Sequence, residues 1–170
     1  MFGKKKKLEK EIEERAEIRR QVENDVYIIT KPSHIEAKIE NGFLRIKRTD
    51  PTSRILVGST GVKSIKIDGI AGINQQLPKK KANGFLQFTL SGNEHEKGLW
   101  GAIHDENSIM YNEVDVEIAD KLKNRIESLI NATQQSSTNT SDLRALKDLL
   151  DDGIITQEEF DAKKKQILGL

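Results

Sequence analysis

The stretch DLRALKDLLDDGIITQEEFDAKKKQILGL, residues 142–170, decides the fold of the C-terminal part of this chain. Leu143, Leu146, Leu149 and Leu150 recur at helical spacing, which predicts a helix with one apolar stripe. Gly153 follows two aspartates and predicts the end of that helix, because glycine adopts the left-handed C′ conformation without a Cβ penalty. Thr156 and Glu159 form a capping-box pattern that predicts the start of a second helix.

The predicted helical hairpin is too small to be stable by itself. Ile155 and Phe160 occupy the two positions of a hydrophobic staple. About thirty residues bury too little surface for independent folding, and the chain has no cysteine that could form a disulfide. The apolar stripes must therefore contact the rest of the chain, a second copy or a foreign partner. The residues predicted to bind a partner are Leu146, Leu150, Ile155, Phe160 and Ile167.

The run LRALKDLLDDGIITQEEFDAKKKQIL, residues 143–168, resembles the short C-terminal domain (SHOCT) of bacterial and phage proteins. The resemblance rests on the spaced leucines, the glycine turn, the Ile-Thr-x-Glu-Glu-Phe motif and the lysine-rich end. It implies a helical hairpin with no assigned chemistry. The suspected roles of the family are oligomerisation and binding.

The length and composition of the chain indicate one domain of ordinary size with additional segments. The 170 residues are 35% hydrophobic and 32% charged, with a formal net charge of +1, so no global field attracts nucleic acid or membranes. The absence of cysteine and of a long apolar run favours a cytoplasmic protein without a signal peptide or a membrane span.

Hydrophobic periodicity predicts an α+β fold for the remainder of the chain. Residues 4–24 read as a charged helix, and residues 35–48 read as a β-hairpin around Asn41-Gly42. Residues 115–131 have the pattern of an amphipathic helix that covers the strands, and residues 133–141 (TQQSSTNTS) read as a flexible linker. Other strands are predicted at residues 26–30, 54–57, 62–67, 70–76, 84–90 and 109–111.

Residues 61–92 and 104–111 resemble bacterial pleckstrin-homology-like domains of unknown function. The resemblance lies in an Ile-x-Ile-x-x-Ile strand, a long loop and a Gly-Phe-Leu-x-Phe strand. It implies a seven-stranded antiparallel barrel that the amphipathic helix closes, and binding rather than catalysis. The predicted parts are thus a charged helix (1–24), a pleckstrin-homology-like domain (25–132), a linker (133–141) and a short C-terminal hairpin (142–170).

No motif indicates catalysis, a metal or a cofactor. His34, His95 and His104 lack metal-ligand spacing, and no nucleophile elbow or phosphate-binding loop is present. Trp100 is expected to fill the barrel core rather than to anchor a ligand. Two basic clusters are candidates for contact with anions or membranes, although a solvated surface explains both: Lys4, Lys5, Lys6 and Lys7, and Lys79, Lys80 and Lys81.

The sequence therefore predicts a non-catalytic adaptor that binds another protein or assembles with itself through its C-terminal hairpin. One alternative is a peripheral protein at the inner face of the membrane, held by Phe2 and the first lysine cluster. Another is a phage nucleic-acid-binding or anti-defence factor, but no aromatic residues lie among the lysines at 79–81, so we do not expect nucleic acid to bind there.

Overall fold

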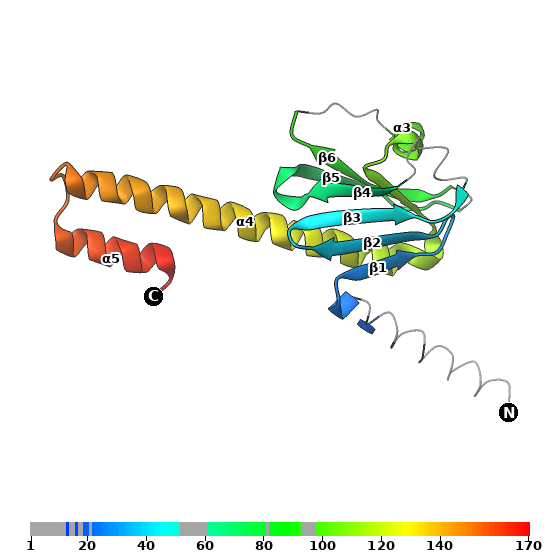
Figure 1. Ribbon diagram of the computed structural model, residues 1–170, viewed down its shortest axis with the longest axis horizontal. Coiled ribbons are helices and arrows are strands. Elements are labelled where there is room, and N and C mark those ends of the chain that lie inside the picture. The colour runs from blue at the N-terminus through cyan, green and yellow to red at the C-terminus, as the bar shows by residue number, and fades with distance from the viewer. Residues whose placement is uncertain are drawn as a thin grey trace. The chain divides into compact units, whose positions relative to one another are not determined.

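Strands β1 to β4 form the first of two antiparallel sheets in the structure, a computed structural model that describes residues 13, 16, 19–20, 22–51, 61–80, 82–92 and 98–170. In chain order they are β1 (Val26–Ile29), β2 (Ile35–Glu40), β3 (Phe43–Arg48) and β4 (Val62–Lys66), and each pairs with the next (Figure 1). Alternate residues of β2 are buried, as its sequence predicts. Asn41 and Gly42 both have positive φ, at 51° and 78°, as a two-residue type I′ turn requires.

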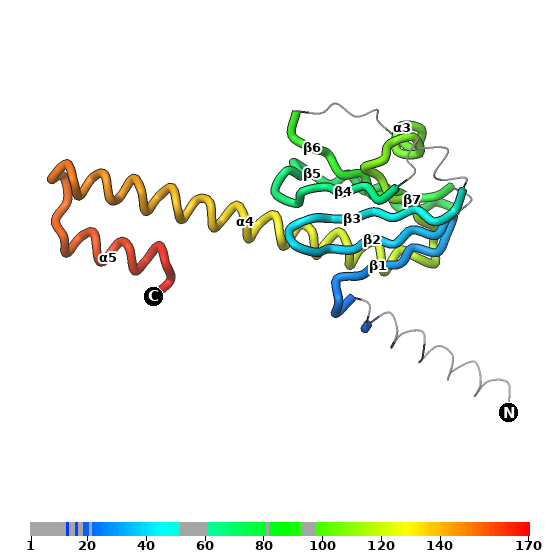
Figure 2. The backbone as a smooth tube through the Cα atoms, viewed as in Figure 1, coloured from blue at the N-terminus to red at the C-terminus, as the bar shows by residue number. Residues whose placement is uncertain are grey.

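The second sheet has the order β5 (Ile70–Gln76), β6 (Gly84–Leu90) and β7 (Ser108–Tyr111), again antiparallel (Figure 2). The short 3-10 helix η1 (Ile67–Gly69) separates β4 from β5, and the register shifts between Ile70 and Gly72. The shift marks an irregularity in the pairing at the start of β5. Five consecutive residues of the central strand β6, from Gly84 to Phe88, are buried, so this strand lies inside the N-terminal unit.

The predicted antiparallel α+β class is confirmed, whereas no closed barrel forms among the described strands. η1 interrupts the ladder after Lys66, so the chain leaves one sheet before it enters the other. The predicted strand at 54–57 lies outside the described residues, as does most of the predicted helix at 4–24; the described residues of that segment up to Glu23 are helical. The chain divides into two compact units, Met1–Glu127 and Ser128–Leu170.

A buried arginine joins the two sheets. Arg48, the last residue of β3, donates hydrogen bonds from Nη2 to the carbonyl oxygens of Glu106, at 3.0 Å, and of Ser108, at 2.6 Å. Burial lowers the pKa of the Arg48 guanidinium, and the neighbouring carboxylates of Glu106 and Asp105 oppose that shift. The two carbonyl acceptors offset part of the cost of burying the cation.

The beginning of α4 (Val116–Asp151) completes the core of the N-terminal unit. Its buried residues are Ile118, Ala119, Leu122 and Ile126, which share one helical face as the sequence predicts. Hydrogen bonds connect this part of the helix to both sheets: Gln75 of β5 donates to Asp120 at 2.7 Å, and Arg125 donates to Asp25, which precedes β1, at 2.9 Å.

The prediction of a flexible linker at residues 133–141 is wrong, because α4 is continuous through this segment. Serine and threonine weaken helices when their hydroxyls compete for backbone partners. Here the hydroxyls donate to the carbonyl four residues earlier, for example Ser136 to Ala132 and Thr140 to Ser136, each at 2.9 Å. Extending an existing helix also costs less than starting one, so the ordered turns before this segment support it.

Trp100 does not fill a core. It lies on α3 (Gly98–His104) with 71% of its surface exposed, while the small residues Gly101 and Ala102 form the buried face of that helix. Its carbonyl oxygen is 3.0 Å from Nδ1 of His104, and the two rings are 4.7 Å apart. The prediction of a core tryptophan is therefore wrong, because the smaller neighbours already occupy the space against the sheet.

The burial of the two tyrosines predicts that the N-terminal unit loses stability at alkaline pH. Tyr27 and Tyr111 are fully buried, and burial with the nearby Asp25 carboxylate raises the pKa of Tyr27 to about 12. Burial likewise raises the pKa of Tyr111. Because both folded-state values exceed the unfolded value of about 10, this contribution to stability is complete below about pH 10. It is lost as the pH rises toward the folded-state values.

An absorbance titration of tyrosinate measures this effect. We expect the native protein at about pH 11 to hold far less tyrosinate than the same protein in concentrated urea, where both side chains ionise near their usual value. Tyr27→Phe should remove from the native titration the group whose pKa is about 12. Native tyrosines that titrate together at about pH 10 would contradict the burial of their hydroxyl groups.

We expect Asp115 to contribute more to the stability of the N-terminal unit than any other carboxylate in it. It is 5% exposed and accepts hydrogen bonds from the backbone N–H groups of Thr30, at 3.0 Å, and Lys31, at 2.8 Å. We expect Asp115→Asn to lower the free energy of unfolding by about 1.5–3 kcal/mol, because charged hydrogen-bond acceptors in buried sites contribute that much. The exposed neighbour Glu113 offers a matched control, and Glu113→Gln should change stability by no more than about 0.5 kcal/mol in urea unfolding.

Candidate interaction site

The end of α4 in the C-terminal unit is fixed by a Schellman motif. Gly153 has φ +71° and donates its N–H to the carbonyl of Leu150 at 3.0 Å. Ile154 donates to the carbonyl of Leu149 at 2.9 Å, which is the second hydrogen bond of the motif. The structure thus confirms the left-handed glycine that the sequence predicts. The turn that follows reverses the chain.

The start of α5 (Gln157–Leu168) is fixed by the predicted capping box. The hydroxyl of Thr156 accepts from the backbone N–H of Glu159 at 3.3 Å, and the Glu159 carboxylate accepts from the N–H of Thr156 at 2.9 Å. Each hydrogen bond satisfies a donor that would otherwise lack an intrahelical partner. Both helix ends at the turn are therefore determined by local sequence.

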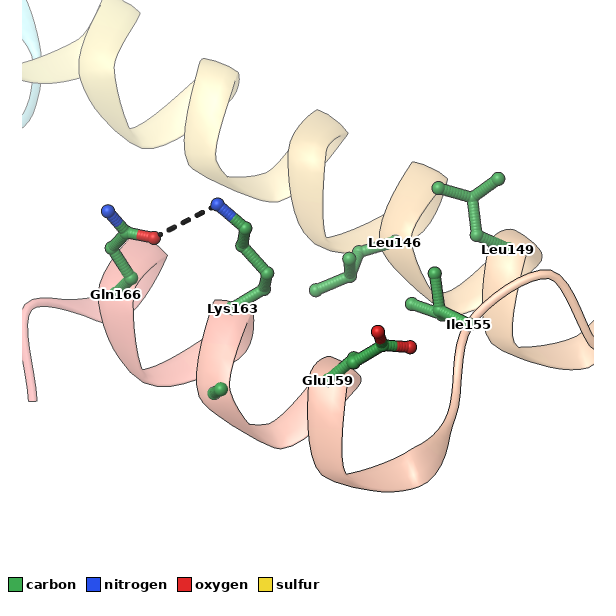
Figure 3. Close-up of a pocket in the computed structure, with 7 residues that line it drawn as sticks. Leu146, Leu149, Ile155, Glu159, Lys163 and Gln166 are labelled. Atoms are coloured by element: carbon green, nitrogen blue, oxygen red, sulfur yellow. Dashed lines mark hydrogen bonds between the residues drawn. The ribbon is translucent and has the colours of Figure 1, made fainter.

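An apolar groove of about 450 Å³ lies between the end of α4 and α5 (Figure 3). Leu146 points from α4 toward α5, and Ile155 lies beside it at the turn end. Glu159, Lys163 and Gln166 line the groove along α5, and Lys163 donates to the side-chain oxygen of Gln166 at 3.3 Å. The complete lining is Leu146, Leu149, Ile155, Glu159, Ala162, Lys163 and Gln166.

The C-terminal unit contains no buried residue anywhere in Ser128–Leu170, a segment described throughout. The five residues predicted to bind a partner are all half-buried: Leu146, Leu150, Ile155, Phe160 and Ile167. Leu146 and Ile155 line the groove, whereas Leu150, Phe160 and Ile167 do not. The Nζ of Lys164 lies 5.9 Å from the ring centroid of Phe160, close enough for a cation–π contact. Their role in binding stays a prediction.

Two apolar groove residues, Leu149 and Ala162, were not among the residues predicted to bind a partner, although Leu149 belongs to the predicted apolar stripe. Alanine is small and is easily left out of an apolar stripe, although Ile155, Glu159, Ala162 and Gln166 follow helical spacing. That spacing was the signal that could have revealed the α5 side of the groove. The polar members of the lining, on the other hand, carry no apolar signal at all.

The basic clusters remain without a structural site. Lys79 and Lys80 are exposed in a tight turn, where Lys79 and Ala82 exchange backbone hydrogen bonds of 3.0 and 2.8 Å. Lys81 lies outside the described residues, and so do Lys4, Lys5, Lys6 and Lys7. Their contact with anions or membranes stays a prediction.

The predicted absence of catalysis and cofactors also stays a prediction. Among the described residues, no group of three or more histidine or acidic side chains could hold a metal ion. His34 and His104 are exposed, and His95 lies outside the described part of the chain. No helix within the described ranges combines the length and apolar character that crossing a membrane requires.

The capping box predicts a measurable local effect. Thr156→Ala should destabilise α5 by about 1 kcal/mol, because the Glu159 amide loses its acceptor. Amide hydrogen exchange across α5 should then become about fivefold faster. Thr156→Ser keeps a hydroxyl at the cap and serves as the control. Equal exchange rates in the alanine and serine variants would show that the cap does not hold the helix.

Comparison with known families identifies the hairpin. Residues 141–168, which cover the end of α4, the turn and all of α5, match the Short C-terminal domain family (SHOCT). This match confirms the first resemblance seen in the sequence. No curated protein and no solved structure matches the chain. The C-terminal segment of this chain is therefore a short C-terminal domain.

Proposed function

We propose that this protein is a non-catalytic interaction protein that assembles with further copies of itself through its C-terminal hairpin. The observation that carries the proposal is the open apolar groove between α4 and α5. The groove exposes leucine and isoleucine side chains in a unit that contains no buried residue. Covering such surface is favourable by roughly 25 cal/mol per Å² of apolar area removed from water.

The shape of the groove also suits association with another helix. Ala162 lies in its lining, and a small residue allows a second helix to approach closely. Leu146, Leu149 and Ile155 provide the branched side chains that fill the spaces between helices. A bundle of two hairpins would give each apolar stripe the cover that one hairpin cannot supply.

The N-terminal unit would act as the scaffold that the hairpins bring together, and we propose that it is pleckstrin-homology-like. Support comes from its sheets of four and three antiparallel strands, followed by the helical turns with Ile118 and Leu122 on their buried face. The resemblances in the sequence favour a bacterial or phage protein of the cytoplasm. Nothing in the described residues favours the membrane-bound or nucleic-acid-binding alternatives over assembly.

A substitution that fills the groove tests the proposal in the full chain. Ala162→Gln places a polar amide in the groove, and glutamine maintains the helix well. Burying that amide should weaken assembly by about tenfold to a hundredfold, corresponding to about 1–3 kcal/mol for a polar group without a partner. Light scattering over a dilution series measures the change in mass.

Ala145→Gln provides a matched control, because Ala145 is also an exposed alanine of the same hairpin but lies outside the groove lining. We expect this variant to assemble like the wild type. If the wild type is a monomer at every concentration, or if both variants keep the wild-type mass, the groove does not mediate self-assembly.

A further inference from the structure

The hairpin has opposite charges at its two ends. The turn end carries six carboxylates and the single cation Lys147, which pairs with Asp151. At the open end, Asp142 is the only acidic side chain beside four cationic side chains. The acidic residues of the turn end are Asp148, Asp151, Asp152, Glu158, Glu159 and Asp161, and the cations of the open end are Arg144, Lys163, Lys164 and Lys165.

Helix dipoles explain only part of this arrangement. Glu158 and Glu159 lie at the N-terminus of α5 and Lys165 near its C-terminus, where the dipole favours them. Asp148, Asp151 and Asp152 lie at the C-terminal end of α4, where the dipole disfavours carboxylates, and the last turn of α4 holds no basic residue. These three aspartates are therefore disfavoured by the dipole within a single hairpin, and a cationic partner would relieve them.

Lys163 supplies that cation at the groove itself. Its Nζ donates a hydrogen bond to the neutral side chain of Gln166, at 3.3 Å, and it has no ion-pair partner among the described residues. Glu159 precedes it by four residues, the spacing at which a glutamate and a lysine normally pair on a helix. The Glu159 carboxylate instead accepts from the N–H of Thr156 in the capping box. Lys163, at the groove edge, is thus available to pair with a carboxylate of another molecule.

We infer that the groove takes a second copy of the same hairpin in antiparallel orientation, so that the basic open end of each copy lies against the acidic turn end of the other. This inference rests on the proposed self-assembly and adds its geometry. A two-fold axis perpendicular to the hairpins produces two identical contacts between opposite charges. A parallel arrangement would place the two acidic turn ends together, and like charges at close range oppose association.

Salt dependence distinguishes the two orientations. The Debye length falls from roughly 30 Å at 0.01 M salt to about 3 Å at 1 M. An antiparallel dimer loses attraction as salt rises, so its dissociation constant, measured by light scattering on the full chain, should increase several-fold. A parallel dimer loses repulsion, and its dissociation constant would decrease. Tighter association at high salt, or no change, would overturn the antiparallel arrangement.

A variant without the lysine charges of the hairpin, compared with a matched control, tests whether the salt effect comes from the hairpin. Replacing Lys163, Lys164 and Lys165 by glutamine should weaken the dimer at low salt and remove most of its salt dependence. Lys79→Gln combined with Lys80→Gln removes two exposed lysines of the N-terminal unit and should leave both properties as in the wild type. If the control variant changes the salt response as much as the hairpin variant does, the inference is wrong.

Spin labels provide a geometric measurement. The chain has no cysteine, so Gln157→Cys, Asp161→Cys and Leu168→Cys each create one labelling site, at the start, middle and end of α5. Gln157 and Leu168 are about 17 Å apart along the helix axis, at 1.5 Å per residue. In an antiparallel dimer the two end labels should give longer label-to-label distances than the middle label.

The outcomes separate this inference from the proposed function. Three similar, short distances in a protein that is dimeric by light scattering would overturn the antiparallel orientation and leave self-assembly intact. A protein that stays monomeric by light scattering would overturn self-assembly and this inference together.

Discussion

The attachment of the first turns of α4 to both sheets is the constraint on which the N-terminal unit depends. The two sheets share no strand pairing among the described residues. They are connected by the hydrogen bonds that Gln75 donates to Asp120 and that Arg125 donates to Asp25, together with the Arg48 guanidinium. Ile118, Leu122 and Ile126 then exclude water from the space that the sheets leave open. Asp115 fixes the entry of the helix by holding the backbone at Thr30 and Lys31.

The C-terminal unit follows a different principle, because its shape comes from hydrogen bonds at the turn and not from a core. Gly153 ends one helix and Thr156 begins the next within three residues. Local caps of this kind determine where helices end, but they contribute only about 1 kcal/mol each. Such a unit has a defined geometry and little stability of its own, which is the condition under which an apolar groove gains most from a partner.

The features that sequence predicted well are those with local causes. Alternation in β2, the Asn41-Gly42 turn and the capping box depend on residues next to each other in the chain. The predictions of a closed barrel and a buried Trp100 were wrong because they depended on contacts between residues distant in the sequence. The prediction of a flexible linker was wrong because composition does not show which hydrogen bonds the hydroxyl groups make. The composition around Ser136 and Thr140 is typical of linkers, but in the structure their hydroxyls donate to the carbonyls four residues earlier in a helix. A lone tryptophan is typical of a core, but here Gly101 and Ala102 occupy the buried face of α3 instead of Trp100.

The caps also bear on how the hairpin would associate. A helix that orders only on binding loses conformational entropy at that moment, which weakens its affinity. In this hairpin the Schellman motif and the capping box already hold Leu146 on α4 beside Ile155 in the turn, so less ordering would remain for association. The Glu159 carboxylate that completes the cap is the one that would otherwise pair with Lys163. The same residue thus fixes the start of α5 and leaves Lys163 without an ion pair among the described residues.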